Sequence, residues 1–357
     1  MEHVNEMRSI ESNSTLCPSI DDFRNQVYST SYSLITVLGL AGNGFALVVL
    51  IRTYRPSSPF QVYMLNLAVS DLLCVSTLPM RVVYYVKKGQ WNQGDFLCRI
   101  TTCALYVNLY CSIYFMAAMS VTRFLAIVFP VQNRLLVTAK RARLVCAGIW
   151  LFICLASSPF LMFGQKFDPA TNKTKCFEPP IGQDVSKVVM LSNLSLVLGF
   201  LLPFLVILLC YAGIIHTLLS RTPWTRRQQD TGPKAIRMII IVLLTFLVSF
   251  MPYHVQRSIH IHSLYRTDTS CSEKVVMQKS VVVTLCLAAA NSCFDPLLYF
   301  FSGENFLSRL SSMRQSRSTR TFNNSVRLNV ARTETGVNRQ LNATSFIPNK
   351  SAVHSGE

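Results

Sequence analysis

Two arginines stand inside long apolar stretches, where a positive charge is unfavourable. Arg81 lies near one end of the stretch 60–86, and Arg257 follows Pro252 within the stretch 234–262. A guanidinium facing lipid would cost several kcal/mol, so both side chains are expected to face the interior of a helix bundle. An internal ion pair is the alternative, but few acidic residues lie at the same level, and an arginine fork pairs well with a carboxylate. The pattern therefore favours recognition of an anionic ligand.

Four tyrosines lie at the level of these arginines. Each could serve in packing alone, but together they place hydroxyl groups beside two cations in an apolar region, which is typical of a small-molecule site. The predicted ligand-binding residues are Arg81, Tyr85, Tyr106, Tyr110, Tyr253 and Arg257.

Two carboxylates, Asp71 and Asp295, also stand within apolar stretches. A buried carboxylate needs a compensating charge or a proton. Either a carboxyl group is protonated, or a hard cation such as sodium, to which oxygen ligands are suited, compensates the charge.

Other residue types that could bind metal or perform catalysis do not form a recognisable site. His260 and His262 are two positions apart, which points them to different faces of a helix, and His254 is expected to be a buried hydrogen-bonding group. The sequence contains no H-E-x-x-H, G-x-S-x-G or P-loop motif. We therefore predict no enzyme, no catalytic residue, no cofactor or metal beyond the sodium hypothesis, and no nucleic-acid partner.

The elements that must position these residues are membrane-spanning helices. Half of the 357 residues are hydrophobic and only 14% are charged, well below the roughly 25% of soluble domains. A helix needs about 20 mostly apolar residues to cross a bilayer. Seven stretches qualify, at about 27–53, 60–86, 95–129, 141–163, 187–220, 234–262 and 276–301. The predicted fold is all-α, a seven-transmembrane helix bundle.

Orientation follows from the basic residues in the short loops, which mark the cytoplasmic side. They cluster after the first, third, fifth and seventh stretches, for example at Arg52, Arg55, Arg134, Arg141, Arg221, Arg237 and Arg309. The N-terminus is therefore expected outside a plasma membrane, and no apolar signal segment is expected in the first twenty residues. The sequons at Asn13 and Asn172 fall on the outer side and are predicted glycosylation sites.

The order of polar motifs along the seven stretches resembles that of the rhodopsin-like (class A) G-protein-coupled receptors. The matching segments are Gly42-Asn43, Leu67-Ala68-Val69-Ser70-Asp71, Cys98, Arg123, Trp150, Pro203 with Tyr211, Phe250-Met251-Pro252-Tyr253 and Asp295-Pro296-Leu297-Leu298-Tyr299. The resemblance covers residues 26–312. It implies that activation and G-protein coupling involve Arg123, Tyr211, Phe250, Pro252, Pro296 and Tyr299.

Three positions depart from the family pattern. Thr122 precedes Arg123 where an acid is usual, so the inactive-state lock is expected to be looser or made elsewhere; Phe250 replaces a common Trp, and Asp295 replaces a common Asn. The resemblance also implies a sodium site formed by Asp71, Asn108, Ser112, Asn291 and Asp295, with Asn43 and Ser292 nearby. It implies the disulfides Cys98–Cys176 and Cys17–Cys271.

Within that family, several segments resemble the cysteinyl leukotriene receptors, among them Arg81-Val82-Val83-Tyr84-Tyr85-Val86 and Tyr106-Val107-Asn108-Leu109-Tyr110. The resemblance implies a receptor that couples cysteinyl leukotrienes to a heterotrimeric G protein of Gq type, with Gi as the alternative, and to calcium mobilisation in inflammation. Two other functions remain open: a class A receptor for another anionic ligand, such as a nucleotide or a lysophospholipid, and a membrane transporter or enzyme.

The predicted domain organisation has four parts: an extracellular segment at 1–25, the transmembrane domain at 26–302, an amphipathic membrane-surface helix at 303–312 that contacts lipid, and a disordered cytoplasmic tail at 313–357. The tail is rich in Ser and Thr. These hydroxyls are expected to be substrates of receptor kinases and to recruit arrestin.

Overall fold

The computed structural model describes residues 17–53, 57–162, 164–169, 171–177, 185–220, 226–263 and 270–302. The predicted surface helix at 303–312, the tail and the acceptor Asn13 lie outside these residues. So does the loop residue Arg55.

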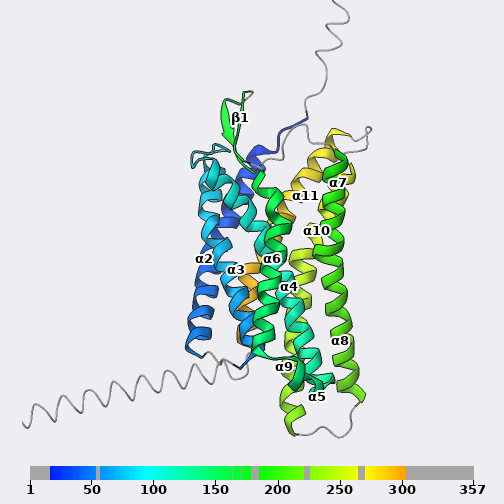
Figure 1. Ribbon diagram of the computed structural model, residues 1–357. Coiled ribbons are helices and arrows are strands. Elements are labelled where there is room, and N and C mark those ends of the chain that lie inside the picture. Colours follow the sequence, from blue (N-terminus) through cyan, green and yellow to red (C-terminus); the bar gives the residue numbers. More distant parts are fainter. Residues whose placement is uncertain are drawn as a thin grey trace, which may run out of the picture. The chain divides into compact units, whose positions relative to one another are not determined.

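Seven helical segments in the described residues are long and apolar enough to cross a membrane (Figure 1). In chain order they are α2 (Asp21–Arg52); α3 (Pro59–Val86); α4 (Asp95–Val128); α6 (Ala139–Ser157) with η1 (Ser158–Met162); α7 (Val185–Leu194), η2 (Ser195–Leu201) and α8 (Leu202–Ser220); α9 (Arg226–Thr245), η3 (Phe246–Phe250) and α10 (Met251–Ser263); and α11 (Cys271–Ala289) with α12 (Asn291–Ser302). The predicted seven-helix bundle is confirmed.

Two short elements were not predicted. The loop after α4 contains the helix α5 (Pro130–Leu136), and the loop after η1 contains the antiparallel strands β1 (Lys166–Asp168) and β2 (Lys173–Lys175), in which Phe167 pairs with Thr174. The hairpin and α5 lie at opposite ends of the bundle (Figure 1). Each is too short to give a hydrophobic period that can be read from sequence.

The first and last spans begin earlier than hydropathy alone predicts. α2 starts at Asp21, with Asp21 and Asp22 in its first turn, where acidic side chains favour a helix N-terminus. α11 starts at Cys271 because the Ser270 side chain accepts a hydrogen bond from the Glu273 backbone N–H. These polar first turns carry both helices beyond their apolar cores.

Two spans contain π-helical segments next to a proline. η2 precedes Pro203 and η3 precedes Pro252. Proline has no backbone N–H and its ring displaces the preceding turn, so the local hydrogen-bond ladder widens there. Both segments lie at the level of predicted functional residues, since Phe250 ends η3 and Tyr253 follows it.

The helices pack around α4, which contacts α3, α6 and α8. Outward-facing positions carry large exposed apolar side chains such as Leu144 and Leu209, as a lipid environment requires. Small residues permit the closest approaches inside the bundle. A Cβ atom added at Gly42 would lie 2.9 Å from Pro296 Cγ on α12, whereas one added at Gly44 would meet no atom within 4 Å.

Candidate functional site: a cation-lined cavity above a buried carboxylate pair

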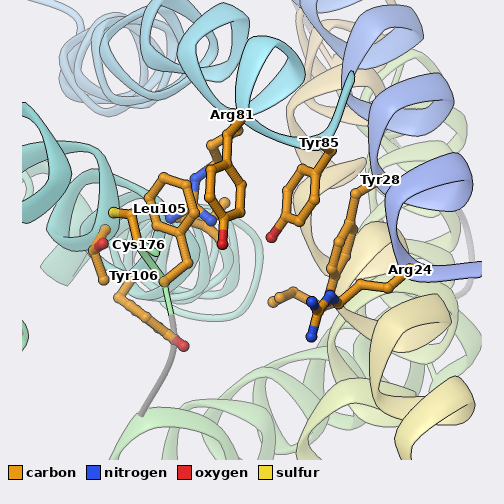
Figure 2. Close-up of a pocket in the computed structure, with 11 residues that line it drawn as sticks. Arg24, Tyr28, Arg81, Tyr85, Leu105, Tyr106 and Cys176 are labelled. Carbon is orange, nitrogen blue, oxygen red and sulfur yellow. The ribbon is translucent and has the colours of Figure 1, made fainter. Parts of the chain in front are cut away.

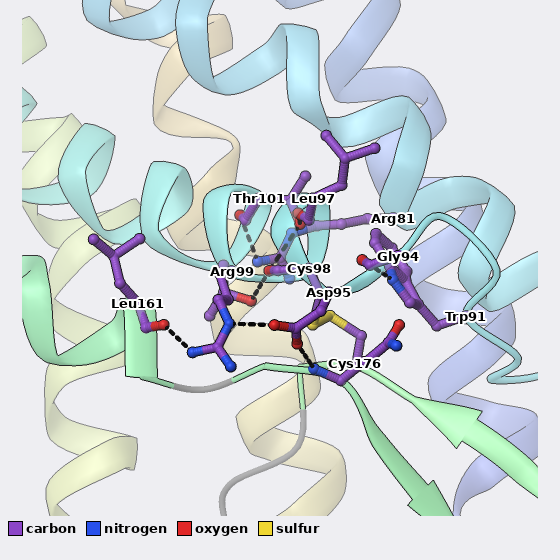
Figure 3. Close-up of a disulfide and its surroundings, with 12 residues drawn as sticks. Arg81, Trp91, Gly94, Asp95, Leu97, Cys98, Arg99, Thr101, Leu161 and Cys176 are labelled. Carbon is purple, nitrogen blue, oxygen red and sulfur yellow. Dashed lines mark hydrogen bonds and ion pairs between the residues drawn. A yellow bond between two sulfur atoms is a disulfide. The ribbon is translucent and has the colours of Figure 1, made fainter.

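One end of the bundle is fixed by two disulfides, and we call it the disulfide end. Cys98 at the start of α4 is bonded to Cys176 after β2 (Figure 3). Cys17 is bonded to Cys271 at the start of α11. Both pairings implied by the family resemblance are present. The hairpin is held further by a backbone hydrogen bond of 2.8 Å from Trp91 N to Thr174 O.

A cavity of about 110 Å³ opens near this end, and three of the predicted ligand-binding residues line it. They are Arg81, Tyr85 and Tyr106. Figure 2 shows Arg81 and Tyr85 on α3, with Tyr106 on α4 and with Tyr28 and Arg24 on α2. The other lining residues are Tyr84, Thr102, Leu105, Cys176, Phe177 and Leu285.

Arg81 is buried, with 3% of its surface exposed. Its Nη2 donates a hydrogen bond of 3.0 Å to Thr101 O, and its guanidinium carbon lies 4.0 Å from the centre of the Phe177 ring. Among the described residues Arg81 forms no ion pair, and its Nε has no acceptor. A buried cation with an unused donor favours a negatively charged group from outside the protein.

The other three predicted ligand residues form a second cluster. Arg257 Nη1 donates a hydrogen bond of 2.6 Å to Tyr253 Oη, and Tyr110 Oη lies 2.5 Å from Ser195 Oγ. Tyr106 connects the two clusters, because the guanidinium carbon of Arg257 lies 5.7 Å from its ring centre. The six residues therefore form two adjoining groups that share one aromatic ring.

The sequence reasoning missed Arg24 and Tyr28, which also line the cavity. They are four positions apart on α2 and therefore lie on one helix face. Arg24 Nη2 forms an ion pair of 2.6 Å with Asp21. Arg24 and Tyr28 stand at the start of an apolar stretch, and an arginine followed by a tyrosine four positions later is also the pattern of Arg81 and Tyr85. This shared pattern could have predicted them.

The carboxylate pair lies deeper in the bundle. Asp71 on α3 and Asp295 on α12 are both fully buried, and they interact electrostatically. Asp71 Oδ1 accepts hydrogen bonds from Asn108 Nδ2 at 2.8 Å and from Ser292 Oγ at 3.1 Å. Asp71 Oδ2 and both Asp295 carboxyl oxygens have no hydrogen-bond donor among the described residues.

The surrounding residues provide further oxygen atoms. Ser112 and Asn291 are fully buried; Ser112 lies beside Asp295, and the Asn291 side-chain oxygen has no partner among the described residues. Asn43 holds Ser292 in place beside Asp71, since the Asn43 Nδ2 donates a hydrogen bond of 2.7 Å to Ser292 O. Buried oxygens without donors fit a hard monovalent cation such as sodium.

The opposite end of the bundle carries the predicted coupling residues. Thr122 Oγ1 donates to Ala118 O, and the Arg123 guanidinium carbon lies 4.4 Å from the centre of the Phe60 ring on α3. Tyr211 Oη lies 2.8 Å from Ser120 Oγ, which joins α8 to α4. At the position where an acid is usual, Thr122 thus leaves Arg123 stacked on an aromatic ring.

The remaining coupling residues lie in the bundle interior. Phe250 and Tyr299 are fully buried. Phe250 packs edge-on against Phe246, with ring centres 5.2 Å apart. Tyr299 lies close enough to interact electrostatically with Asp71 and Asp295. Phe250 thus packs inside the bundle, and Tyr299 lies near the carboxylate pair.

Comparison with known proteins agrees with this architecture. Residues 42–299 match the family described as 7 transmembrane receptor (rhodopsin family). The chain is 60% identical to cysteinyl leukotriene receptor 1 of Homo sapiens over 305 residues, which cover 85% of this chain and 90% of that protein. It is 39% identical to human cysteinyl leukotriene receptor 2 over 84% of both chains, and 35% identical to the human uracil nucleotide/cysteinyl leukotriene receptor over 83% of this chain and 79% of that protein.

The family match runs from the first span to the seventh and includes Arg81, the carboxylate pair and Arg123. A family of receptors excludes the enzyme and transporter alternatives. The chain belongs to the rhodopsin family of seven-transmembrane receptors, and within that family it stands close to the type 1 cysteinyl leukotriene receptors.

Proposed function

We propose that this receptor binds cysteinyl leukotrienes at the disulfide end of the bundle. The observation that carries the proposal is the buried Arg81, which has an unused donor and lines one cavity together with Arg24 and four tyrosines. Cysteinyl leukotrienes have carboxylates and a peptide amine at one end and an apolar chain at the other. The carboxylates would pair with Arg81, Arg24 and Arg257, and the chain would lie among apolar side chains of α4, α6 and α8.

The cavity requires an opening movement to admit a whole ligand. Its volume of about 110 Å³ is below the roughly 300–1,000 Å³ of sites for drug-sized molecules. Tyr106 lines this cavity and also faces Arg257, and its ring stacks on Phe160 with ring centres 3.8 Å apart. Rotation of Tyr106 would join the two clusters into one site that holds carboxylates at both arginines.

The disulfide end is the extracellular end in this proposal, because disulfides form in oxidising compartments. The N-terminus is then outside and the receptor spans the plasma membrane. Asn172, exposed in the hairpin turn, is available for glycosylation. Ligand binding would shift the equilibrium toward a state whose Arg123 end accepts a G protein of Gq type, or of Gi type, with release of calcium and later recruitment of kinases and arrestin by the tail.

Sodium at the carboxylate pair would stabilise one state of this equilibrium. Asp71, Asp295, Ser112, Asn108 and Asn291 would hold it, and the ion would supply the positive charge that the two buried carboxylates lack. We expect agonist affinity to depend on sodium in the parent. Asp71→Asn should remove at least half of that dependence, as measured by radioligand competition with sodium replaced by N-methylglucamine. Equal sodium dependence in parent and variant would contradict the site.

The first experiment is a calcium response to leukotriene D4 in cells that express the chain, with Arg81→Ala in parallel. Loss of a charge-assisted hydrogen bond to the ligand costs about 1.5–3 kcal/mol of binding free energy. The midpoint, which is the leukotriene D4 concentration that gives a half-maximal calcium response, should therefore rise roughly 10- to 100-fold in Arg81→Ala. Lys166→Ala, at an exposed cation on the hairpin, is the matched control and should leave the midpoint unchanged.

A ligand panel tests the alternative. The name of the 35% identical relative includes uracil nucleotides, so uridine diphosphate and a lysophospholipid belong on that panel. Stimulation of nucleotide exchange by one of these ligands, with no response to leukotrienes in a receptor shown to reach the surface, would replace the proposed ligand and keep the receptor function.

A further inference from the structure

Phe177 follows the disulfide-bonded Cys176 and covers the face of the Arg81 guanidinium. The distance from the Arg81 guanidinium carbon to the Phe177 ring centre is 4.0 Å, well within the range of a cation–π contact. Phe177 also lines the same cavity as Arg81. The loop residue and the cation therefore belong to one local structure.

The position of Phe177 is imposed by its surroundings. Its backbone has φ of 70°, a left-handed conformation that is unfavourable for a bulky residue. The ring is held edge-on by Tyr84 and by Trp91, with ring centres 5.3 Å away in both cases. The Cys98–Cys176 disulfide fixes the preceding residue to α4. A backbone held in this conformation against its own preference indicates a placement that the fold maintains.

The contact determines how Arg81 can meet a ligand. One nitrogen, Nη2, is bonded to Thr101 O (Figure 3), and Phe177 covers a face of the guanidinium plane. Nε remains buried without an acceptor. An arginine whose plane is fixed in this way offers an edge to a carboxylate, which is the orientation needed for paired N–H···O bonds.

We infer that Phe177 is a positioning residue that holds the Arg81 guanidinium edge-on to the cavity, so that a ligand carboxylate binds in one orientation. The inference rests on the proposed function, because it assumes a carboxylate-bearing ligand. It assigns the loop after η1, which contains the β1–β2 hairpin and Phe177, a role in the strength of anion binding and in ligand selection.

The test compares four single variants in radiolabelled leukotriene D4 binding. Phe177→Leu keeps apolar volume and removes the ring; Phe177→Ala removes both; Phe177→Tyr keeps the ring. Phe167→Ala is the matched control, because Phe167 lies in β1 of the same loop and is 62% exposed. A cation–π contact of 0.5–2 kcal/mol corresponds to a roughly 2- to 30-fold change in Kd. We expect the Kd to rise by this factor in Phe177→Leu and by at least this factor in Phe177→Ala. Phe177→Tyr should bind leukotriene D4 almost as well as the parent, and Phe167→Ala should bind it equally well.

Two further measurements separate positioning from general loop damage. In an Arg81→Gln background, Phe177→Leu should have no further effect on binding. A leukotriene analogue with esterified carboxyl groups should also be insensitive to Phe177→Leu. The inference would be overturned if Phe177→Leu and Phe177→Ala both bound like the parent. It would also be overturned if Phe177→Leu weakened binding as much in the Arg81→Gln background as in the parent.

A ligand-free measurement keeps the inference testable if the proposed function fails. Thermal unfolding of the purified receptor, Phe177→Leu, Arg81→Gln and the double variant forms a double-mutant cycle. Non-additive shifts in Tm support the Phe177–Arg81 contact even if the parent binds no leukotriene, in which case only the ligand assignment is wrong. Additive shifts would disprove the contact, whatever the ligand is.

Discussion

At the scale of single residues, the proposed function depends on buried charges. Arg81 and Asp71 are unfavourable in an apolar interior unless something compensates them, and their positions within apolar stretches drew attention to both. Residues whose roles depend on three-dimensional neighbours could not be found in that way. Phe177 is an ordinary aromatic residue in the sequence, and Phe60 acquires its meaning only because Arg123 stacks on it.

The Arg123–Phe60 contact leads to a prediction about basal signalling. Phe60→Leu should raise ligand-independent nucleotide exchange on a G protein about 2- to 5-fold, because a partly buried cation–π contact of roughly 0.5–1 kcal/mol that holds Arg123 is lost. Adding Thr122→Glu should restore low basal exchange by adding an ion pair between residue 122 and Arg123. Basal exchange that stays at the parent level in Phe60→Leu would show that this stack does not restrain activation.

At the scale of elements, close packing of α2 against α12 depends on Gly42. Gly42→Ala should lower the free energy of unfolding by about 1–3 kcal/mol, as overpacking usually does, because the new methyl group would press on the rigid ring of Pro296. Gly44→Ala, two positions away where no atom lies within 4 Å, should be neutral or slightly stabilising. Thermal melting in detergent distinguishes the two variants; equal Tm values would argue against the close approach.

The elements also show how far sequence reasoning extends. All seven spans were predicted, because a bilayer demands about 20 apolar residues and that length is visible in sequence. The early start of α11 depends on the Ser270 cap, which is a local signal that hydropathy ignores. The β1–β2 hairpin, α5 and the lining residue Arg24 escaped prediction, because each is placed by tertiary contacts and by a few residues without periodicity. The Arg81 and Arg257 clusters were predicted as one group, and their arrangement as two groups that share the Tyr106 ring was not anticipated.

At the scale of the whole molecule, charge is unevenly distributed around the cavity end. Exposed lysines near the disulfide end include Lys87, Lys88, Lys274 and Lys279. Such a field attracts an anionic ligand over distances comparable to the Debye length, which falls from about 10 Å at 0.1 M salt to about 3 Å at 1 M.

This field predicts a salt-dependent association rate. The association rate constant of leukotriene D4 should fall several-fold between 0.1 M and 1 M salt, while its dissociation rate changes less, because steering acts before contact. Replacing Lys87 and Lys88 with Ala should flatten that dependence without altering the rate of dissociation. Kinetic radioligand binding measures both constants, and an association rate independent of salt would rule out steering.

The Cys17–Cys271 disulfide has a consequence for the order of events during biosynthesis. Its two cysteines are 254 positions apart, against 78 for Cys98 and Cys176. The shorter link can close once the hairpin has emerged, whereas Cys17 has to wait until six spans have been inserted and the seventh has begun. Until then its thiol stays open to alkylation and to exchange with folding oxidoreductases. Closure of this bond therefore marks a chain whose translation is nearly finished, and the secretory pathway could distinguish completed receptors from truncated ones by the state of a single thiol, that of Cys17.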